Sequence, residues 1–219
     1  MSSKTNHSEN KTLDCLYRGQ SITVDGQTLS WTAAPNWHIG LGVADHFHAV
    51  SLVVALDDTV FVETDALGWK LYKVTTPGTL AGAKPSYPGA NNEAIVDGTA
   101  TLTEQYAALE AGTAFVEPTS ADYARVAVLS SLANWSGTQG AGTTVASTGI
   151  DGTIENNNPI TYPDAATAGY GKVGMFGFFD AATGGNLFRK AFMNSPVEIG
   201  LGAANISFTN NQLTNQEDN

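Results

Sequence analysis

Two histidines separated by a single residue, His46 and His48, are the residues whose type and spacing point most directly to chemistry. In a strand, residues two apart project from the same face. Both imidazoles could therefore bind one metal ion, with Asp45 or Asp57 nearby. Three such pairs around a three-fold axis would offer six nitrogens and octahedral coordination. The alternative is the polar start of a strand in a solvent-facing loop, and the sequence predicts no other metal ligands and no cofactor.

Four tryptophans could either stack on sugar rings or fill a core, and burial is the more common role because the indole covers a large apolar area. Trp69 lies in a segment with mixed polar and apolar faces, and we predict it as the contact to a ligand. The other three are Trp31, Trp37 and Trp135.

Catalytic patterns are not found in this sequence. A nucleophile triad needs serine or cysteine, histidine and an acid held together, and no Gly-x-Ser-x-Gly elbow occurs. Cys15 lies in a predicted helix and is interpreted as a small core residue. The paired carboxylates Asp57-Asp58 and Glu217-Asp218 are adjacent and would face opposite ways in a strand, which disfavours glycosidase chemistry. We therefore predict no catalytic residues and a protein that is not an enzyme.

Two further segments resemble ligand loops only loosely. Residues 151–158 (DGTIENNN) supply many oxygens that could hold Ca²⁺, but they lack the spacing of an EF-hand and are typical of a turn. Residues 137–142 are glycine-rich, but neither a Gly-Lys-Ser/Thr ending nor a helix start follows, so they do not predict a phosphate loop.

The amino-acid composition limits the classes of partner that this protein could bind. The 219 residues include only 14% charged side chains, and 21 acidic against ten basic residues give a net charge of −11. Phosphate binding needs a concentrated basic face, so nucleic acid is excluded as a partner, and an anionic membrane surface is disfavoured for the same reason. No apolar run approaches the roughly 20 residues that span a bilayer.

A single cysteine permits no intrachain disulfide, so folding in a reducing cytosol is compatible with the sequence. The polar N-terminus has no apolar segment of the kind found in a signal peptide. Residues 1–10 are predicted as a flexible arm.

The elements that must position these residues are mostly short strands joined by glycine-rich turns, which predicts an all-β fold. The clearest is a hairpin over 173–189, in which the apolar run VGMFGFF precedes the turn DAATGGN. Glycines 174 and 177 leave room for a neighbouring backbone or ring. A short helix is expected over 11–18, ending at Gly19. A hairpin with a type I′ turn at Asp25-Gly26 should follow over 21–32.

The middle of the chain has weaker signals. Residues 36–41 predict a strand, and 49–56 predict a strand buried on both faces. Residues 57–58 mark a turn before a strand over 59–63, and 69–74 alternate in the manner of an edge strand. Residues 77–92 form a long loop. Residues 101–111 favour a helix, with a strand over 99–103 as the alternative.

The C-terminal half predicts a strand over 122–129, a loop with one weak strand over 137–152 and a short strand near 160–162. Two short strands should lie near 197–199 and 206–208, followed by a polar tail over 209–219. Residues 11–208 are thus expected to form one antiparallel β-sandwich domain.

Three blocks in this half carry a resemblance to a known family: Asp122-Tyr-Ala-Arg-Val-Ala-Val128 with Asn134-Trp135, Ile160-Thr-Tyr-Pro163, and Gly171 to Leu187 (GKVGMFGFFDAATGGNL). In this order they resemble the "SYARV", "ITFP" and "THFGLFDAATGGNLL" segments of small tailed-bacteriophage virion proteins usually described as phage tail fibre proteins. The segment APNWHIGL over 34–41 resembles the family's early strand. The resemblance covers residues 11–42 and 113–213, and the chain departs from it in an insertion over 43–112.

The resemblance implies a β-sandwich that assembles symmetrically on a phage particle, with no catalytic residues to transfer. We therefore expect a non-enzymatic structural component of the virion, either a tail fibre or neck appendage or a capsid decoration (cement) protein. The expected partners are identical subunits in a homotrimer, other virion proteins and a host surface glycan. The alternative from another class is a carbohydrate-binding module, for which exposed aromatic rings along a groove would be the mark.

Overall fold

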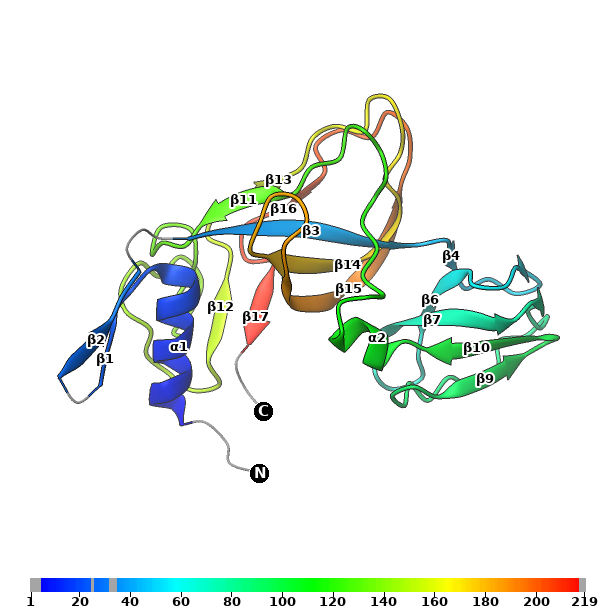
Figure 1. Cartoon of the computed structure of the whole chain (residues 1–219), viewed down its shortest axis with the longest axis horizontal. Coiled ribbons are helices and arrows are strands. Elements are labelled where there is room, and N and C mark those ends of the chain that lie inside the picture. The colour runs from blue at the N-terminus through cyan, green and yellow to red at the C-terminus, as the bar shows by residue number, and fades with distance from the viewer. Residues whose placement is uncertain (1–4, 25, 32–34, 217–219) are drawn as a thin grey trace.

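A computed structural model describes residues 5–24, 26–31 and 35–216 (Figure 1). Strands dominate, and nearly all of their pairings are antiparallel. The all-β fold class with a short N-terminal helix is therefore confirmed. The chain forms a main body from residues 5–24, 26–31, 35–44 and 113–216 and an inserted lobe from residues 45–112, which lies to one side of the body in Figure 1.

Helix α1 spans Asn6–Arg18 and packs one face against the main body. The Thr5 side chain caps it by accepting a hydrogen bond from Ser8 N–H, and Gly19 ends it in the left-handed conformation (φ 66°). The helix thus begins five residues earlier than the sequence predicted. Residues 6–10, expected in a flexible arm, form its first turns because of this cap, and the side chains of Glu9 and Asn10 are buried.

The hairpin predicted after the helix is present. Strand β1 (Ile22–Val24) pairs with β2 (Gln27–Leu29), and Gly26 has φ 73°. The other turn residue, Asp25, lies outside the described residues, as does Thr32, where the second strand was predicted to end. The turn type therefore stays a prediction.

The main body is built on a four-stranded sheet in the order β11-β3-β14-β15. Its strands are β11 (Val126–Leu129), β3 (Asn36–Ala44), β14 (Gly171–Phe179) and β15 (Leu187–Ile199). The predicted hairpin over 173–189 is confirmed as the turn between β14 and β15, with the two strands in antiparallel register. The strand predicted near 197–199 is the end of β15 and not a separate element. Because Val43 and Ala44 pair with β14, the inserted lobe begins at Asp45.

Short two-stranded ribbons form the second layer of the sandwich. Strand β12 (Thr153–Glu155) pairs with β17 (Thr214–Gln216), and β13 (Ile160–Thr161) pairs with β16 (Ser207–Phe208). The tail predicted over 209–219 is therefore wrong for residues 213–216, because Leu213 is buried and β17 joins a ribbon. No strand forms over 137–152 within the described chain.

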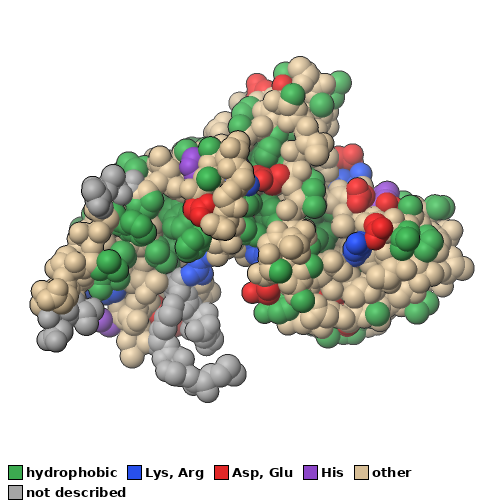
Figure 2. Space-filling view, viewed as in Figure 1, with side chains coloured by type: hydrophobic (Ala, Val, Ile, Leu, Met, Phe, Trp, Pro, Cys, Tyr) green, Lys and Arg blue, Asp and Glu red, His purple; other side chains and the backbone are tan. Residues whose placement is uncertain are grey.

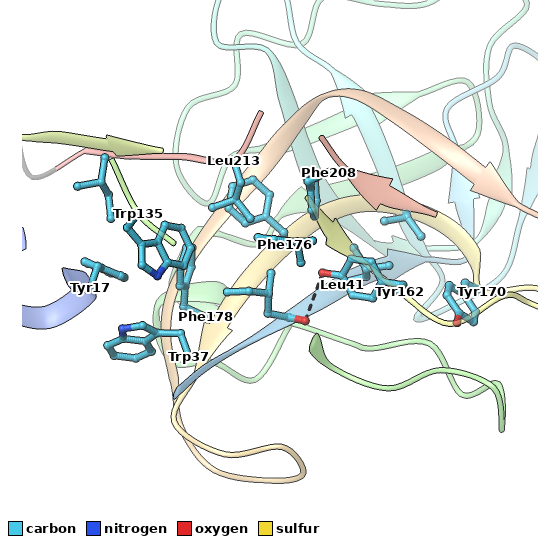
Figure 3. Close-up of a cluster of buried hydrophobic side chains, with 14 of the residues drawn as sticks. Tyr17, Trp37, Leu41, Trp135, Tyr162, Tyr170, Phe176, Phe178, Phe208 and Leu213 are labelled. Carbon is cyan, nitrogen blue, oxygen red and sulfur yellow. Dashed lines mark hydrogen bonds between the residues drawn. The ribbon is translucent and has the colours of Figure 1, made fainter. Parts of the chain in front are cut away.

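An aromatic core lies between the sheet, the ribbons and α1 (Figure 3). Tyr17 of α1 and Trp37 of β3 have ring centroids 5.3 Å apart, and Phe178 of β14 lies 5.5 Å from Tyr17. Tyr162 donates a hydrogen bond to the Ile39 carbonyl, drawn as a dashed line in Figure 3. The remaining labelled residues of this core are Leu41, Trp135, Tyr170, Phe176, Phe208 and Leu213.

The inserted lobe has its own five-stranded sheet in the order β4-β6-β7-β10-β9. Its strands are β4 (His46–Phe47), β6 (Thr59–Glu63), β7 (Trp69–Thr76), β10 (Ala100–Glu104) and β9 (Ala94–Asp97). Strands β4 and β6 are parallel, and the remaining pairs are antiparallel. Strand β5 (Val53–Val54) pairs with β8 (Gly78–Thr79) beside this sheet. The buried aliphatic and tyrosine side chains of the lobe form a second core.

Three predictions for the lobe need correction. Residues 49–56 do not form a strand buried on both faces: only Val53–Val54 is a strand, and Val50, Val53 and Leu56 are 53%, 71% and 57% exposed. Ser51 and Asp57 have positive φ, so turns interrupt this apolar run. Strand β7 is central and not an edge strand, because β10 covers its second side.

The helix predicted over 101–111 is wrong for its first half. Strand β10 runs to Glu104, in agreement with the alternative prediction of a strand over 99–103. The short helix α2 spans only Tyr106–Glu110. The loop predicted over 77–92 is present apart from the two residues of β8.

A third apolar cluster joins the lobe to the main body and defines the seam. Phe61 of β6 and Phe192 of β15 meet edge to face, with ring centroids 6.4 Å apart. Gly174 makes this approach possible, since a Cβ there would lie 2.7 Å from the Phe61 ring. Lys190 of β15 also forms an ion pair with Glu110 of α2. None of the helices in the described part of the chain is long and apolar enough to cross a bilayer.

Candidate functional site

A cleft of about 300 Å³ opens at the seam, between the turn joining β6 to β7 and the middle of β15. Trp69, the residue predicted to contact a ligand, lies in its wall. The ring of Trp69 packs edge-on against Phe47, with centroids 6.2 Å apart, which fixes its position while one side lines the cleft. The residues around the cleft are Glu63, Leu67, Gly68, Trp69, Lys70, Phe192, Met193 and Asn194.

Among the described indoles, Trp69 is the one that is both partly exposed and without an acceptor for its N–H, since the Trp135 N–H also lacks an acceptor but is buried. Trp31 and Trp37 donate their N–H groups to the carbonyls of Cys15 and Leu16, at 2.7 and 2.8 Å. Trp135 is fully buried in the core. Trp69 is only partly buried, and its N–H has no acceptor within the described chain. It can therefore donate to water or to a ligand.

The polar rim of the cleft keeps spare hydrogen-bonding capacity. The Glu63 carboxylate and the Asn194 amide are exposed and have no partner among the described residues. The Lys70 ammonium is 4.0 Å from the buried Glu104 carboxylate, which holds it near the rim. The cleft thus combines an aromatic wall with a carboxylate, an amide and an ammonium group.

The two histidines predicted to share a metal are each paired with a different carboxylate. His46 Nε2 is 3.1 Å from Asp58 Oδ2, and His48 Nε2 is 2.8 Å from Asp97 Oδ2. His46 is in β4, whereas His48 follows its end.

The two acids proposed to assist these histidines are occupied elsewhere. The Asp45 carboxylate accepts hydrogen bonds from Thr59 N–H and O–H, and Asp57 pairs with Lys73 at 2.8 Å. Across the described residues, no three His, Cys, Asp or Glu side chains come together as a metal-binding group. The metal site, including its three-fold version, stays a prediction.

Asp97 is the centre of a buried polar network in the lobe. Its carboxylate accepts hydrogen bonds from Ala81 N–H and from the Tyr87 hydroxyl, both at 2.8 Å, in addition to the contact with His48. Burial alone would raise the pKa of Asp97, but these hydrogen bonds favour the ionised form and leave its pKa below the usual value. Burial and the bond to Asp97 raise the pKa of Tyr87. Through Ala81 and Tyr87 the network anchors the long loop to β9.

Strand β15 has an open edge. Within the described chain it pairs only with β14, and hollows of about 400 and 630 Å³ lie along it. Phe188 and Val197, on this strand, are 55% and 46% exposed. The face of the molecule shown in Figure 2 carries hydrophobic side chains on both the body and the lobe, and its basic side chains are few and separated. The open edge therefore combines the exposed apolar side chains Phe188 and Val197 with the exposed polar residues Asn194, Ser195 and Glu198.

The other residues considered as candidates from the sequence, Cys15 and the segment 151–158, make contacts that stabilise the fold. Cys15 is buried and free, and burial raises the pKa of its thiol. In the oxygen-rich segment 151–158, Asn156 donates to the carbonyls of Asn158 and Thr209 and so ties the turn to the C-terminal strands.

Sequence analysis missed Glu63, Phe192 and Asn194 as parts of the cleft. No local pattern marks them, because the cleft forms only when the β6–β7 turn meets β15 across the seam. It also missed two arginine clamps. Arg18 pairs with Asp14 at 2.6 Å in the core, and Arg125 pairs with Glu117 at 2.5 Å.

Comparison with known proteins places this architecture in a family. The family described as "Podophage GP4 fiber I protein gp80" matches residues 100–216, just over half of the chain. The match covers every strand from β11 to β17 and leaves out most of the inserted lobe. No curated protein matches the chain. The resemblance of the C-terminal half to phage tail fibre proteins is thereby confirmed, whereas that of residues 11–42 stays a prediction, and the chain belongs to the podophage GP4 fiber I (gp80) family.

Proposed function

We propose that this virion protein is a non-enzymatic structural subunit of a phage fibre, and that it assembles as a homotrimer through the open edge of β15. Family membership supports the virion role. The matched residues include the whole of β15, so the surface proposed for assembly lies in the part shared with the family.

The observation that carries the assembly proposal is the unpaired edge of β15 with its exposed apolar side chains. An edge strand presents unpaired N–H and C=O groups to which a strand of another chain can add. Strand β15 has 13 residues, and the exposed side chains of Phe188 and Val197 lie toward its two ends. A neighbouring subunit would bury these side chains.

Other parts of the proposal have separate support. The buried free thiol of Cys15 and the lack of a second cysteine fit assembly in the reducing cytoplasm of the host. The excess of acidic residues disfavours nucleic acid as a partner. The family's fibre description favours a fibre over a capsid decoration protein, and copies spread over the capsid shell would favour the latter.

The experiment compares the native mass of the full chain with that of two variants. Phe188→Glu places a charge on the open edge, and Leu201→Glu places the same charge on an exposed aliphatic position beyond the strand. We expect a trimer for the parent chain and Leu201→Glu, and a monomer for Phe188→Glu with unchanged circular dichroism. A monomeric parent chain, or a Phe188→Glu variant that stays trimeric, would contradict the proposal.

A further inference from the structure

We propose that the seam cleft binds an uncharged saccharide, with Trp69 providing the stacking face and Glu63, Lys70 and Asn194 holding its hydroxyl groups. The proposed fibre role bears only on where the sugar comes from, namely the host surface. The proposal itself rests on the chemistry of the cleft.

The shape of the cleft fits a ligand of this size. Small-molecule sites usually range from roughly 300 to 1,000 Å³, so a cleft of about 300 Å³ suits one or two sugar rings and not a large ligand. Its walls come from rigid strands, since Trp69 begins the central strand β7 and Phe192 belongs to β15. The stacking surface is therefore formed before the ligand arrives.

The aromatic wall has the features of a stacking platform. A pyranose presents a face of weakly polar C–H groups that packs on an electron-rich ring, and indole has the largest such face. Trp69 is held from behind by Phe47, so ligand binding would not cost much side-chain freedom. Its unpartnered N–H can also donate to a hydroxyl at the ring's edge.

The polar groups select against an anionic sugar. Glu63 and Asn194 can accept hydrogen bonds from adjacent hydroxyls, while Asn194 and Lys70 can donate. An acidic sugar would bring its carboxylate close to the unpaired Glu63 carboxylate, whereas the Lys70 ammonium already lies beside the Glu104 carboxylate, in a chain of net charge −11. We therefore expect neutral hexoses and N-acetylhexosamines to bind in preference to uronic acids.

The test is saturation-transfer NMR of the full chain with glucose, galactose, N-acetylglucosamine, N-acetylgalactosamine and glucuronic acid, followed by titration of any sugar that binds. We expect saturable binding of at least one neutral sugar and weaker binding of glucuronic acid. Trp69→Ala should weaken the affinity about tenfold or more, and Asn194→Ala and Glu63→Gln about three- to tenfold each.

Trp31→Ala is the matched control, because this indole is also partly exposed but lies in the hairpin after α1, away from the cleft. It should bind sugar like the parent chain. Trp69→Phe keeps an aromatic ring and should therefore bind sugar more tightly than Trp69→Ala. This result would show that Trp69→Ala loses affinity because stacking is lost and not because the protein is misfolded. The cleft proposal is wrong if no neutral sugar binds the parent chain, or if Trp69→Ala binds as well as Trp31→Ala. Either result would leave the native-mass test of assembly unaffected.

Discussion

The main body and the inserted lobe stabilise their buried charges in different ways. In the body, Arg18 is fully buried, pairs with Asp14, and donates to the carbonyls of Trp135, Thr143 and Val145. The lobe contains no arginine. Its buried carboxylates are satisfied mainly by backbone N–H groups, tyrosine hydroxyls and a histidine.

This difference predicts different responses to mutation and to pH. Arginine stays protonated at any pH at which the protein folds. In each arginine–carboxylate pair of the body, the arginine therefore keeps its positive charge when the pH changes. In the lobe, Asp97 depends on donors that include Tyr87 and His48. The Asp97 network of the lobe should therefore weaken in acid, where Asp97 is protonated, and in alkali, where Tyr87 is deprotonated.

The largest expected effect is that of Arg18→Ala. Removing the guanidinium leaves Asp14 buried without its charged partner and three carbonyls without their donor. Breaking a buried pair in this way costs about 3–5 kcal/mol. Urea unfolding of the full chain measures the loss, and a change below about 1 kcal/mol would show that the clamp does not stabilise the body.

A medium effect is expected from Gly174→Ala at the seam. The added methyl would lie 2.7 Å from the Phe61 ring, and overpacking of this kind costs about 1–3 kcal/mol. Gly200→Ala is the control, since no atom lies within 4 Å of its Cβ position. The measurement is the melting temperature of each variant by thermal unfolding, and we expect a lower value for Gly174→Ala than for Gly200→Ala. Equal melting temperatures would mean that the lobe does not depend on close contact with β14.

Asp97→Asn tests the lobe and should cost about 1–2 kcal/mol, because asparagine keeps only one acceptor oxygen and places an NH2 group where the second carboxylate oxygen accepted a hydrogen bond. The pKa of Asp97 is lowered in the folded protein, so its contribution is present above a pH of about 4 and is lost as the pH falls through the folded pKa. Urea unfolding between neutral and acidic pH should show a shallower loss of stability in the variant. An acid response equal to that of the parent chain would rule out this role of Asp97.

The smallest effect is predicted for Tyr87→Phe, which removes one hydrogen bond to Asp97 and costs about 0.5–1.5 kcal/mol. The pKa of Tyr87 is raised, so its contribution is complete below a pH of about 10 and is lost as the pH rises toward the folded pKa. The variant should lose less stability than the parent chain in alkaline solution. Unfolding at pH values from neutral to strongly alkaline measures this, and a steeper alkaline loss in the variant would contradict it.

Local signals predicted the body better than the lobe. The β14–β15 hairpin was predicted because its turn residues and flanking apolar run lie within one short segment. Residues 49–56 were misread because apolar composition suggests burial, whereas turns at Ser51 and Asp57 expose three of their side chains. The central position of β7 depends on pairing with β10, which comes much later in the chain and leaves no local pattern.

The candidate site was predictable only in part. Trp69 stood out because its strand carries mixed faces, and the structure places it in a cleft. The opposite wall, Phe192 to Asn194, could not be inferred because the packing of the lobe on β15 brings it there. The resemblance in the C-terminal half predicted the family, since its blocks keep their order along the chain.

Cryo-electron microscopy of purified phage particles tests the central claim most directly, that the chain is a fibre subunit joined to its copies through β15. The account predicts density for this fold in a fibre, with the outer edge of β15 covered by a neighbouring copy and the inserted lobe facing outward. Copies spread over the capsid shell, or fibre subunits whose β15 edge faces solvent, would contradict it.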